Sequence, residues 1–508
     1  MIAPNTNIRL LKTPMELNDA NTLSFASETD KYNYFNSLPK LSLDGATYQR
    51  KEGVLKYPTT SSDTFEDLLQ YNYCMYQNAS YDTKWFYAYI DDIKYINDGM
   101  TEIKLRTDTF MTWQNDIVYK QSFIERQHVS DDTVGLHTVP ENLETGDYVV
   151  NNLEIDSSLT DLAIIVCTTT YSVSGVYGQG QLLNGIYTGL AYVAFNNNTD
   201  GITALNDYIA SFSSKPESII NIFMYPKSLI TGFTSSTISL LLTSSRTTGV
   251  NTYDKTLTIP STINGYTPKN NKVKIYPYRY LIASNNNGTA NILQYEYFNP
   301  SLVFKIEGVV CTGGSIRAIP KNYKGATENQ NEAISGGKYP TCAWISDSFT
   351  NWLTTNAVNV GMGVIGDVAN LATGNYVGLA KGIGEQVSQV YQHHLAPPII
   401  KGNTNTGDVV TSSEDNTFMF YHMSIKQEMA KIIDNYFTMY GYKVNSLETI
   451  NIHKRTYFDY IKTIGCNIIG NIPQKDLEEI RNLFDNGLTI WHNPSYFLDY
   501  SVNNAIIS

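Results

Sequence analysis

The sequence is poor in charged residues. Only 17% of its 508 residues are Asp, Glu, Lys or Arg, whereas about 25% is usual in soluble proteins. The formal net charge is −12. This balance argues against tight nucleic-acid binding, which depends on Lys and Arg displacing counterions. An acidic surface would let nucleic acid pass without holding it, but the charge alone does not distinguish that case from an ordinary acidic protein.

Cysteine is also scarce, and the five residues are scattered along the chain. Their number is odd and no two have metal-ligand spacing, which argues against a disulfide framework and a zinc site. We expect free, mostly buried thiols. The N-terminal residues contain no apolar core of signal-peptide length, so synthesis in a cytoplasm is expected. The five are Cys74, Cys167, Cys311, Cys342 and Cys466.

Catalytic motifs are missing as well. No HExxH, GxSxG or Walker A pattern occurs, and the single histidine pair, His393-His394, consists of adjacent residues whose side chains point apart. The glycines of Gly361–Gly366 spell GxGxxG, but no buried strand precedes them, so a dinucleotide site is not expected. Acidic pairs such as Asp91-Asp92 and Glu478-Glu479 are expected on solvated faces. We therefore expect no catalytic residue, no metal and no cofactor, although carboxylate pairing in space stays open.

Aromatic residues are abundant, with 38 tyrosines, and 42% of the chain is hydrophobic. Tyrosine suits both β-structure and protein–protein contact. The length predicts several domains, and the fold class is mainly β with some α. Runs rich in aromatic and branched residues predict strands at Lys84–Ile90, Met100–Leu105, Tyr119–Ile124, Ala163–Cys167, Ile219–Met224 and Ile238–Leu242.

Helical periodicity is clearest near the C-terminus. Apolar residues from Ile425 to Tyr440 form one stripe, which predicts a helix within Ser424–Tyr442, with Gly441 as its stop. A second helix is predicted from Pro473 to near Gly487, followed by a strand at Leu488–Trp491. Shorter helices are predicted at Asp63–Tyr71 and Thr203–Phe212.

The stretch Asn356–Tyr391 differs from the rest of the chain because it is both apolar and rich in small residues. Glycines recur every fourth residue, which on a helix would form a smooth ridge for close packing. Polar residues interrupt it, so it lacks the run of about 20 apolar residues that a standing membrane span needs. It could be a glycine-rich loop, or a segment that orders only against a membrane or other copies. The candidate residues are Gly361, Gly363, Val364, Ile365, Gly366, Gly374, Val377, Gly378, Leu379, Gly382 and Ile383.

Several motifs resemble one family. The sequence is similar to the tail-knob, or distal tail-tube, proteins of φ29-like short-tailed phages of Gram-positive bacteria, and its size and composition are similar to those of a streptococcal member's knob. An apolar segment ending in Ala396-Pro397-Pro398 stands in the family's order. The flanking motifs are Tyr71–Ile90, Asp108–Val129, Tyr440–Asn445 and Leu483–His492.

The resemblance implies an architecture. It implies a tail-tube-like β-barrel domain at residues 1–150, an inserted β-rich knob domain at 151–340, the apolar loop with its flank at 341–418, and an α/β segment at 419–508 that returns to the tube. It also implies a homohexameric ring in the virion tail, with viral DNA passing through the lumen without sequence-specific binding.

The resemblance further implies partners. These are the lower collar or connector with other tail proteins, and the host membrane, which residues 356–391 would contact after plugging the lumen. Two alternatives stay open at this stage. One is a tail protein that binds cell-wall carbohydrate through residues 151–340, and the other is a cell-wall hydrolase.

Overall fold

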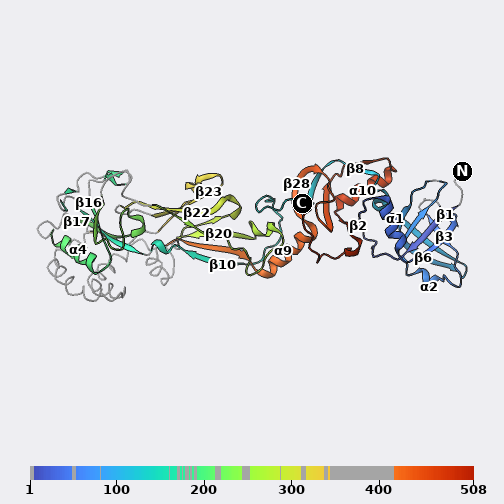
Figure 1. The fold of residues 1–508 in the computed structure, drawn as a ribbon, viewed down its shortest axis with the longest axis horizontal. Helices are drawn as coiled ribbons and strands as arrows, with labels where there is room; N and C mark the ends of the chain where they lie inside the picture. Colours follow the sequence, from blue (N-terminus) through green and yellow to red (C-terminus); the bar gives the residue numbers. More distant parts are fainter. Residues whose placement is uncertain are drawn as a thin grey trace. The chain divides into compact units, whose positions relative to one another are not determined.

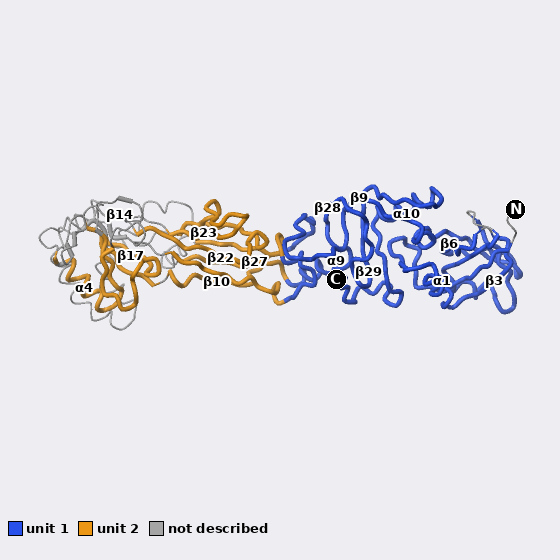
Figure 2. Tube along the Cα trace, turned by 45° about the horizontal axis from the view of Figure 1, so that its top comes forward, with its two compact units in different colours: residues 1–146, 266–274, 427–508 blue, residues 147–265, 275–426 orange. Residues whose placement is uncertain are grey.

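The computed structural model describes most of the chain outside residues 344–416. The chain folds into two compact units (Figures 1 and 2). Unit 1 contains residues 1–146, 266–274 and 427–508, and unit 2 contains 147–265 and 275–426. The described residues are 5–48, 53–80, 82–159, 161–168, 172–173, 176–177, 182–183, 186–187, 191–211, 219–242, 252–285, 288–310, 316–336, 341–343 and 417–507.

The N-terminal part of unit 1 is a six-stranded antiparallel sheet of order β3-β1-β5-β6-β7-β4. Three helices, α1 (Glu28–Ser37), α2 (Phe65–Leu68) and α3 (Thr109–Trp113), lie along the same stretch of chain. The Ser27 side chain caps α1 by accepting a hydrogen bond from the Asp30 backbone. The strands are β1 (Thr6–Leu11), β3 (Lys40–Ala46), β4 (Val54–Tyr57), β5 (Tyr73–Gln77), β6 (Phe86–Asn97) and β7 (Met100–Thr107).

A second sheet of unit 1 combines strands from both ends of the sequence, in the order β2-β31-β29-β9-β28. N-terminal β2 runs parallel to C-terminal β31, and β9 lies between β29 and β28. The helices beside it are α9 (Gln427–Tyr440) and α10 (Gln474–Asn486). The strands are β2 (Asn21–Leu23), β9 (Gln121–Gln127), β28 (Tyr442–Thr449), β29 (Phe458–Ile464) and β31 (Leu488–Trp491), with a separate pair β8 (Ile117–Tyr119) and β30 (Ile468–Gly470).

One apolar core joins the two sheets of unit 1. It contains Ile8 and Ile103 from the first sheet together with Ile461 and Ile490 from the second. Helix α10 adds Phe484, whose ring meets that of Phe110 edge-to-face at 6.1 Å. The two halves of the sequence therefore fold into a common unit.

The described residues of unit 2 form three larger sheets and two short hairpins. The first is four-stranded, of order β10-β27-β20-β21, and the second is five-stranded, of order β18-β16-β11-β17-β26, with helix α4 (Thr199–Ala210) against it. Their strands are β10 (Tyr148–Ile155), β20 (Arg279–Ser284), β21 (Ala290–Leu293), β27 (Met419–Ile425), β11 (Leu162–Thr168), β16 (Ala191–Phe195), β17 (Ile219–Pro226), β18 (Ser239–Leu241) and β26 (Thr341–Ala343).

The third sheet of unit 2 has the order β19-β22-β23-β24, with β25 also paired to β23. Its strands are β19 (Tyr253–Thr256), β22 (Phe298–Gly308), β23 (Ile316–Tyr323), β24 (Ala326–Glu328) and β25 (Ile334–Ser335). The hairpins are β12–β13 (Ser172–Val173 and Val176–Tyr177) and β14–β15 (Leu182–Leu183 and Ile186–Tyr187).

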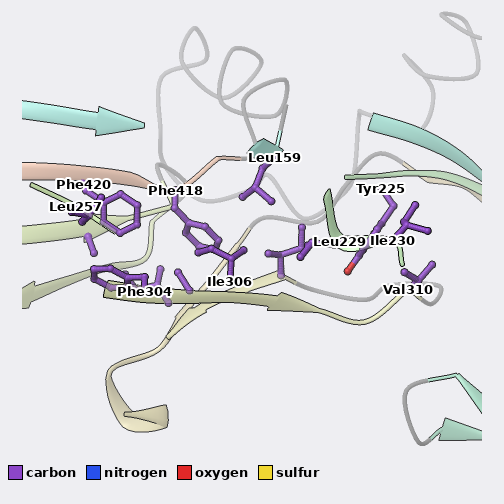
Figure 3. Close-up of a cluster of buried hydrophobic side chains, with 14 of the residues drawn as sticks. Leu159, Tyr225, Leu229, Ile230, Leu257, Phe304, Ile306, Val310, Phe418 and Phe420 are labelled. Atoms are coloured by element: carbon purple, nitrogen blue, oxygen red, sulfur yellow. The ribbon is translucent and has the colours of Figure 1, made fainter. Parts of the chain in front are cut away.

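The core of unit 2 joins all three large sheets. Figure 3 shows Phe420 of β27 beside Leu257 and Phe304, and Phe418, directly before β27, beside Ile306. The rings of Phe304 and Phe420 lie 4.7 Å apart. This cluster holds the strand that follows residues 344–416 firmly in unit 2.

Most predicted elements are confirmed, with shifted ends. The C-terminal strand occupies the predicted residues Leu488–Trp491. Helix α4 starts four residues earlier than predicted because the Asn198 side chain caps it. Along α9 the predicted apolar stripe is interrupted, since Ile432 is 61% exposed while Ile433 is buried.

One predicted strand was wrong as a single element. The residues of Tyr119–Ile124 belong to two strands, β8 and β9, which pair with different partners and are separated at Lys120. Periodicity within a short apolar run does not reveal such a change of partner.

The mainly β fold class is confirmed, and Cys74 and Cys466 are free and buried, as predicted. Cys167 is buried as well. In the described ranges, no helix is long and apolar enough to cross a bilayer.

Candidate functional site

The predicted plug segment lies outside the described residues. This applies to all eleven candidate residues from Gly361 to Ile383 and to the GxGxxG pattern. The described chain before the segment ends in β26, and the described chain after it begins at Thr417 and enters β27. Both strands belong to unit 2, in different sheets. The segment's role stays a prediction.

The acidic pairs considered in the sequence lie on surfaces. Asp91 forms an ion pair with Lys104 at 2.6 Å, and this hydrogen bond lowers the pKa of the Asp91 carboxyl. Glu478 accepts a hydrogen bond from Gln474 on the exposed side of α10. Across the part of the chain that the structure describes, no three His, Cys, Asp or Glu side chains converge on a metal position.

A pocket of about 350 Å³ opens in unit 1 between the loop after β2, the chain after α3 and the chain after β28. Its lining includes no carboxylate and no cysteine among the described residues. Its titratable side chains are Tyr119 and His453, and burial lowers the pKa of the His453 imidazole. A glycosidase needs two carboxyl groups across its substrate, so this pocket does not fit that chemistry. The lining residues are Ser24, Phe25, Ala26, Gln114, Asn115, Tyr119, Ile450, Asn451, Ile452 and His453.

His128 is a buried histidine of unit 1 with a structural role. The His128 ring lies between β29 and α9, where Nδ1 accepts a hydrogen bond from the Tyr460 backbone N–H and Nε2 donates to the Thr438 carbonyl. These two contacts fix the neutral tautomer, and burial lowers the pKa of His128 to about 4. His128 therefore joins a strand to a helix without holding a charge.

A second buried network surrounds Asp459 on β29. Its Oδ2 accepts hydrogen bonds from the Lys454 and Arg455 backbone N–H groups, at 2.9 and 3.1 Å. His492 Nε2 lies 3.0 Å from the same oxygen, directly after β31. The carboxylate therefore fixes the turn before β29 against the end of the neighbouring strand.

The segment 266–274 is inserted into unit 1 from the middle of the sequence. The buried Asp434 carboxylate of α9 holds it by accepting hydrogen bonds from Tyr266 Oη at 2.6 Å and from the Lys269 and Asn270 backbone N–H groups at 2.8 and 2.9 Å. Asn270 Nδ2 adds a further bond of 2.8 Å to Oδ1. We call residues 266–274 the clip.

A buried ion cluster holds the other end of the clip. Lys272 and Arg126 both contact the Glu141 carboxylate, and all three side chains are at least nine-tenths buried. Burial lowers the pKa of Lys272, while Glu141 raises it. The cluster joins the clip to β9 and to the loop after β9.

Sequence inspection missed the clip and its anchors. The sequence did contain one signal for a buried acid. Asp434 lies four residues after Ala430 and three residues before Phe437, so on a helix it shares their apolar face. An acid at such a position needs buried donors. The partner residues, more than 160 positions away, carry no comparable signal.

Two family models match the chain. One describes the C-terminal domain of the Bacillus phage phi29 tail knob protein gp9 and matches residues 242–505, just over half of the chain. The other describes the N-terminus of the caudoviral major tail protein and matches residues 4–120, which contain the six-stranded sheet of unit 1.

Whole proteins are similar as well. The chain is 25% identical to the tail knob protein gp9 of Bacillus phage phi29 over 99% of its own length and 98% of that protein. It is 24% identical to gp9 of Bacillus phage PZA with the same coverage. Its fold matches the tail knob protein gp12 of bacteriophage C1 with a TM-score of 0.71 at 18% identity, over 99% of this chain and all of that one.

These matches confirm the resemblance that the motifs indicated, and they cover the middle of the sequence, where no motif had been found. The chain belongs to the family of the phi29 tail knob protein gp9.

Proposed function

We propose that this protein is a structural, non-enzymatic tail knob of a short-tailed phage, in which six copies form a ring around a channel for viral DNA. The observation that carries the proposal is the similarity to tail knob proteins along 99% of the chain. The protein would lie at the distal end of the virion tail after synthesis in the host cytoplasm.

Each unit has a part in this proposal. Unit 1 would form the tube wall, because N-terminal and C-terminal strands share one of its sheets and because residues 4–120 match a major tail protein model. The part of unit 2 before residue 341 would form the knob, without the clip, which belongs to unit 1. The part of the protein that forms the tube would contact the lower collar or connector and other tail proteins.

The channel would pass DNA without binding it. The net charge of −12 supports this, since an acidic lumen would repel phosphate groups. No sequence-specific contact is needed for passage.

The apolar stretch 356–391 would plug the channel before infection and contact the host membrane afterwards. Its glycine spacing supports close packing against other copies, and its polar interruptions argue against permanent insertion. Release of such a segment would open the channel at the time of DNA ejection.

Liposome leakage tests the membrane role. The full chain and a variant lacking residues 356–391 are added to dye-loaded vesicles at equal concentration. We expect leakage from the full chain and little from the deletion variant, with the same number of copies in both assemblies. Equal leakage from both proteins would contradict the role given to the segment.

A further inference from the structure

The outward face of the four-stranded sheet in unit 2 is almost wholly apolar. Strand register places its side chains in three rows across β10, β27, β20 and β21. Ten of the eleven positions carry an aliphatic, methionine or tyrosine side chain, and the other is Ser284. The rows are Val150–Met423–Tyr280, Leu153–Tyr421–Ile282–Ile292 and Ile155–Met419–Ser284–Ala290. We call these residues the apolar face.

The two sides of this sheet differ in burial. Leu281, Leu293 and Phe420, on the inward side, are fully buried in the core of unit 2. On the apolar face, Leu153 is 42% exposed and Ile292 is 60% exposed. An antiparallel sheet with one solvated face normally carries polar residues on that face, so this pattern indicates a surface that is covered in the working protein.

The chemistry of the apolar face fits a protein partner. None of its eleven side chains is charged, and tyrosine and methionine occur beside branched aliphatic residues, as in the centres of homo-oligomer interfaces. An exposed ion pair, Lys426–Asp147 at 2.7 Å, lies at one end of β10 and β27 and supplies a polar rim. A lipid surface would instead favour Trp and basic residues around the apolar area.

The size of the face also fits one part of a subunit contact. Four strands at about 4.8 Å spacing and three rows of about 7 Å give an area of about 400 Å². A stable interface buries about 800 Å² on each partner, so the face can form the apolar centre of such an interface, and surrounding residues such as Tyr276 and Tyr148 extend it. These two rings lie 6.0 and 5.3 Å from the ring of Tyr280.

We propose that the apolar face packs against a second copy of this chain. The inference rests on the proposed function, in which copies of the chain form a ring, and it names the surface that brings them together. Burial of the three rows would contribute most of the association free energy, while the rim fixes the orientation of the copies.

The test replaces two exposed aliphatic side chains with charges. The variant Leu153→Asp/Ile292→Asp and a matched control, Ile238→Asp, are made in the full chain. Ile238 also lies in unit 2 and is 48% exposed, but it precedes β18 in another sheet. Analytical ultracentrifugation gives the mass across concentration, and circular dichroism checks the fold.

We expect the wild type and the control to share one oligomeric mass, and the double variant to dissociate at a concentration at least tenfold higher. If the aspartates unfold unit 2, Leu153→Gln/Ile292→Gln gives the same readout with a milder change. A folded double variant with the same oligomeric mass as the wild type would overturn this inference but not the proposal that the chain forms a ring. A wild-type monomer at all concentrations would overturn both. Loss of binding to phosphatidylglycerol vesicles in the double variant, with its oligomeric mass unchanged, would also overturn the inference and identify a lipid surface as the occupant.

Discussion

At the scale of residues, buried polar side chains determine how separate parts of the sequence meet in unit 1. Asp434 and Glu141 each accept several hydrogen bonds or ion pairs from segments far apart in the chain. Such groups cost free energy when a partner is removed, because the remaining donors stay buried without acceptors. The first prediction at this scale follows from this cost of removing one partner of a buried hydrogen bond.

Replacing Asp434 should destabilise unit 1 strongly. In Asp434→Ala, the Lys269 and Asn270 backbone N–H groups lose their acceptor in a buried position, and we expect a loss of about 3 kcal/mol or more in the free energy of unfolding. Urea denaturation followed by tryptophan fluorescence measures it. The control is Asn435→Ala, an exposed neighbour on α9, with an expected change within about 0.5 kcal/mol. Equal losses of stability in the two variants would contradict the role of Asp434 in anchoring the clip.

His128 should make unit 1 less stable as pH falls. The unfolded state binds a proton at the ordinary histidine pKa of about 6.5, whereas the folded state stays neutral until its pKa of about 4. Between pH 6.5 and pH 4 the unfolded state therefore binds more protons than the folded state, and the free energy of unfolding falls as the pH falls. The difference between the two pKa values limits this loss to about 3 kcal/mol.

The substitution His128→Gln isolates this effect. The glutamine can keep a hydrogen bond but does not titrate, so the stability of the variant should depend less steeply on pH between 6.5 and 4. Urea midpoints of both proteins at pH 7, 5.5 and 4.5 provide the comparison. Parallel pH profiles would show that His128 does not carry this dependence.

At the scale of elements, the ends of helices depend on single glycines. Gly441 follows α9 with a positive φ of 63°, a conformation that favours glycine. A Cβ atom there would overlap the backbone carbonyl of Gln127 at the end of β9. The turn from α9 into β28 therefore needs glycine for two separate reasons.

The matched pair Gly441→Ala and Gly465→Ala separates these reasons. Gly465 also has a positive φ, 72°, but open space surrounds its Cβ position. We expect Gly465→Ala to cost about 1 kcal/mol through backbone strain alone, and Gly441→Ala to cost several times more. Differential scanning calorimetry measures both, and similar melting temperatures for the two variants would contradict the close approach of β9.

Elements with their own local signal could be predicted from sequence. Gly487, which follows the last helix, and the apolar run Leu488–Trp491 were enough to predict that helix and the strand after it, since both signals are local. The exposed position of Ile432 could not be predicted, because periodicity reports a face of a helix and not which neighbours cover it. The pairing of β2 with β31 depends on contacts across more than 450 residues, which no local pattern records.

At the scale of the molecule, the sequence order and the structural units differ. Unit 1 takes residues from the N-terminus, the clip and the C-terminus, while unit 2 contains the strands on both sides of residues 344–416. The four flanking motifs that carried the family resemblance all lie in unit 1. The plug stays a prediction from composition and resemblance.

Electron microscopy of the purified full-length protein distinguishes a plugged ring from single chains. We expect two-dimensional class averages that show six-fold rings with density filling the hole, and an open hole in the variant lacking residues 356–391. Single chains, or rings whose hole is open in the full-length protein, would contradict the proposal of a plugged ring.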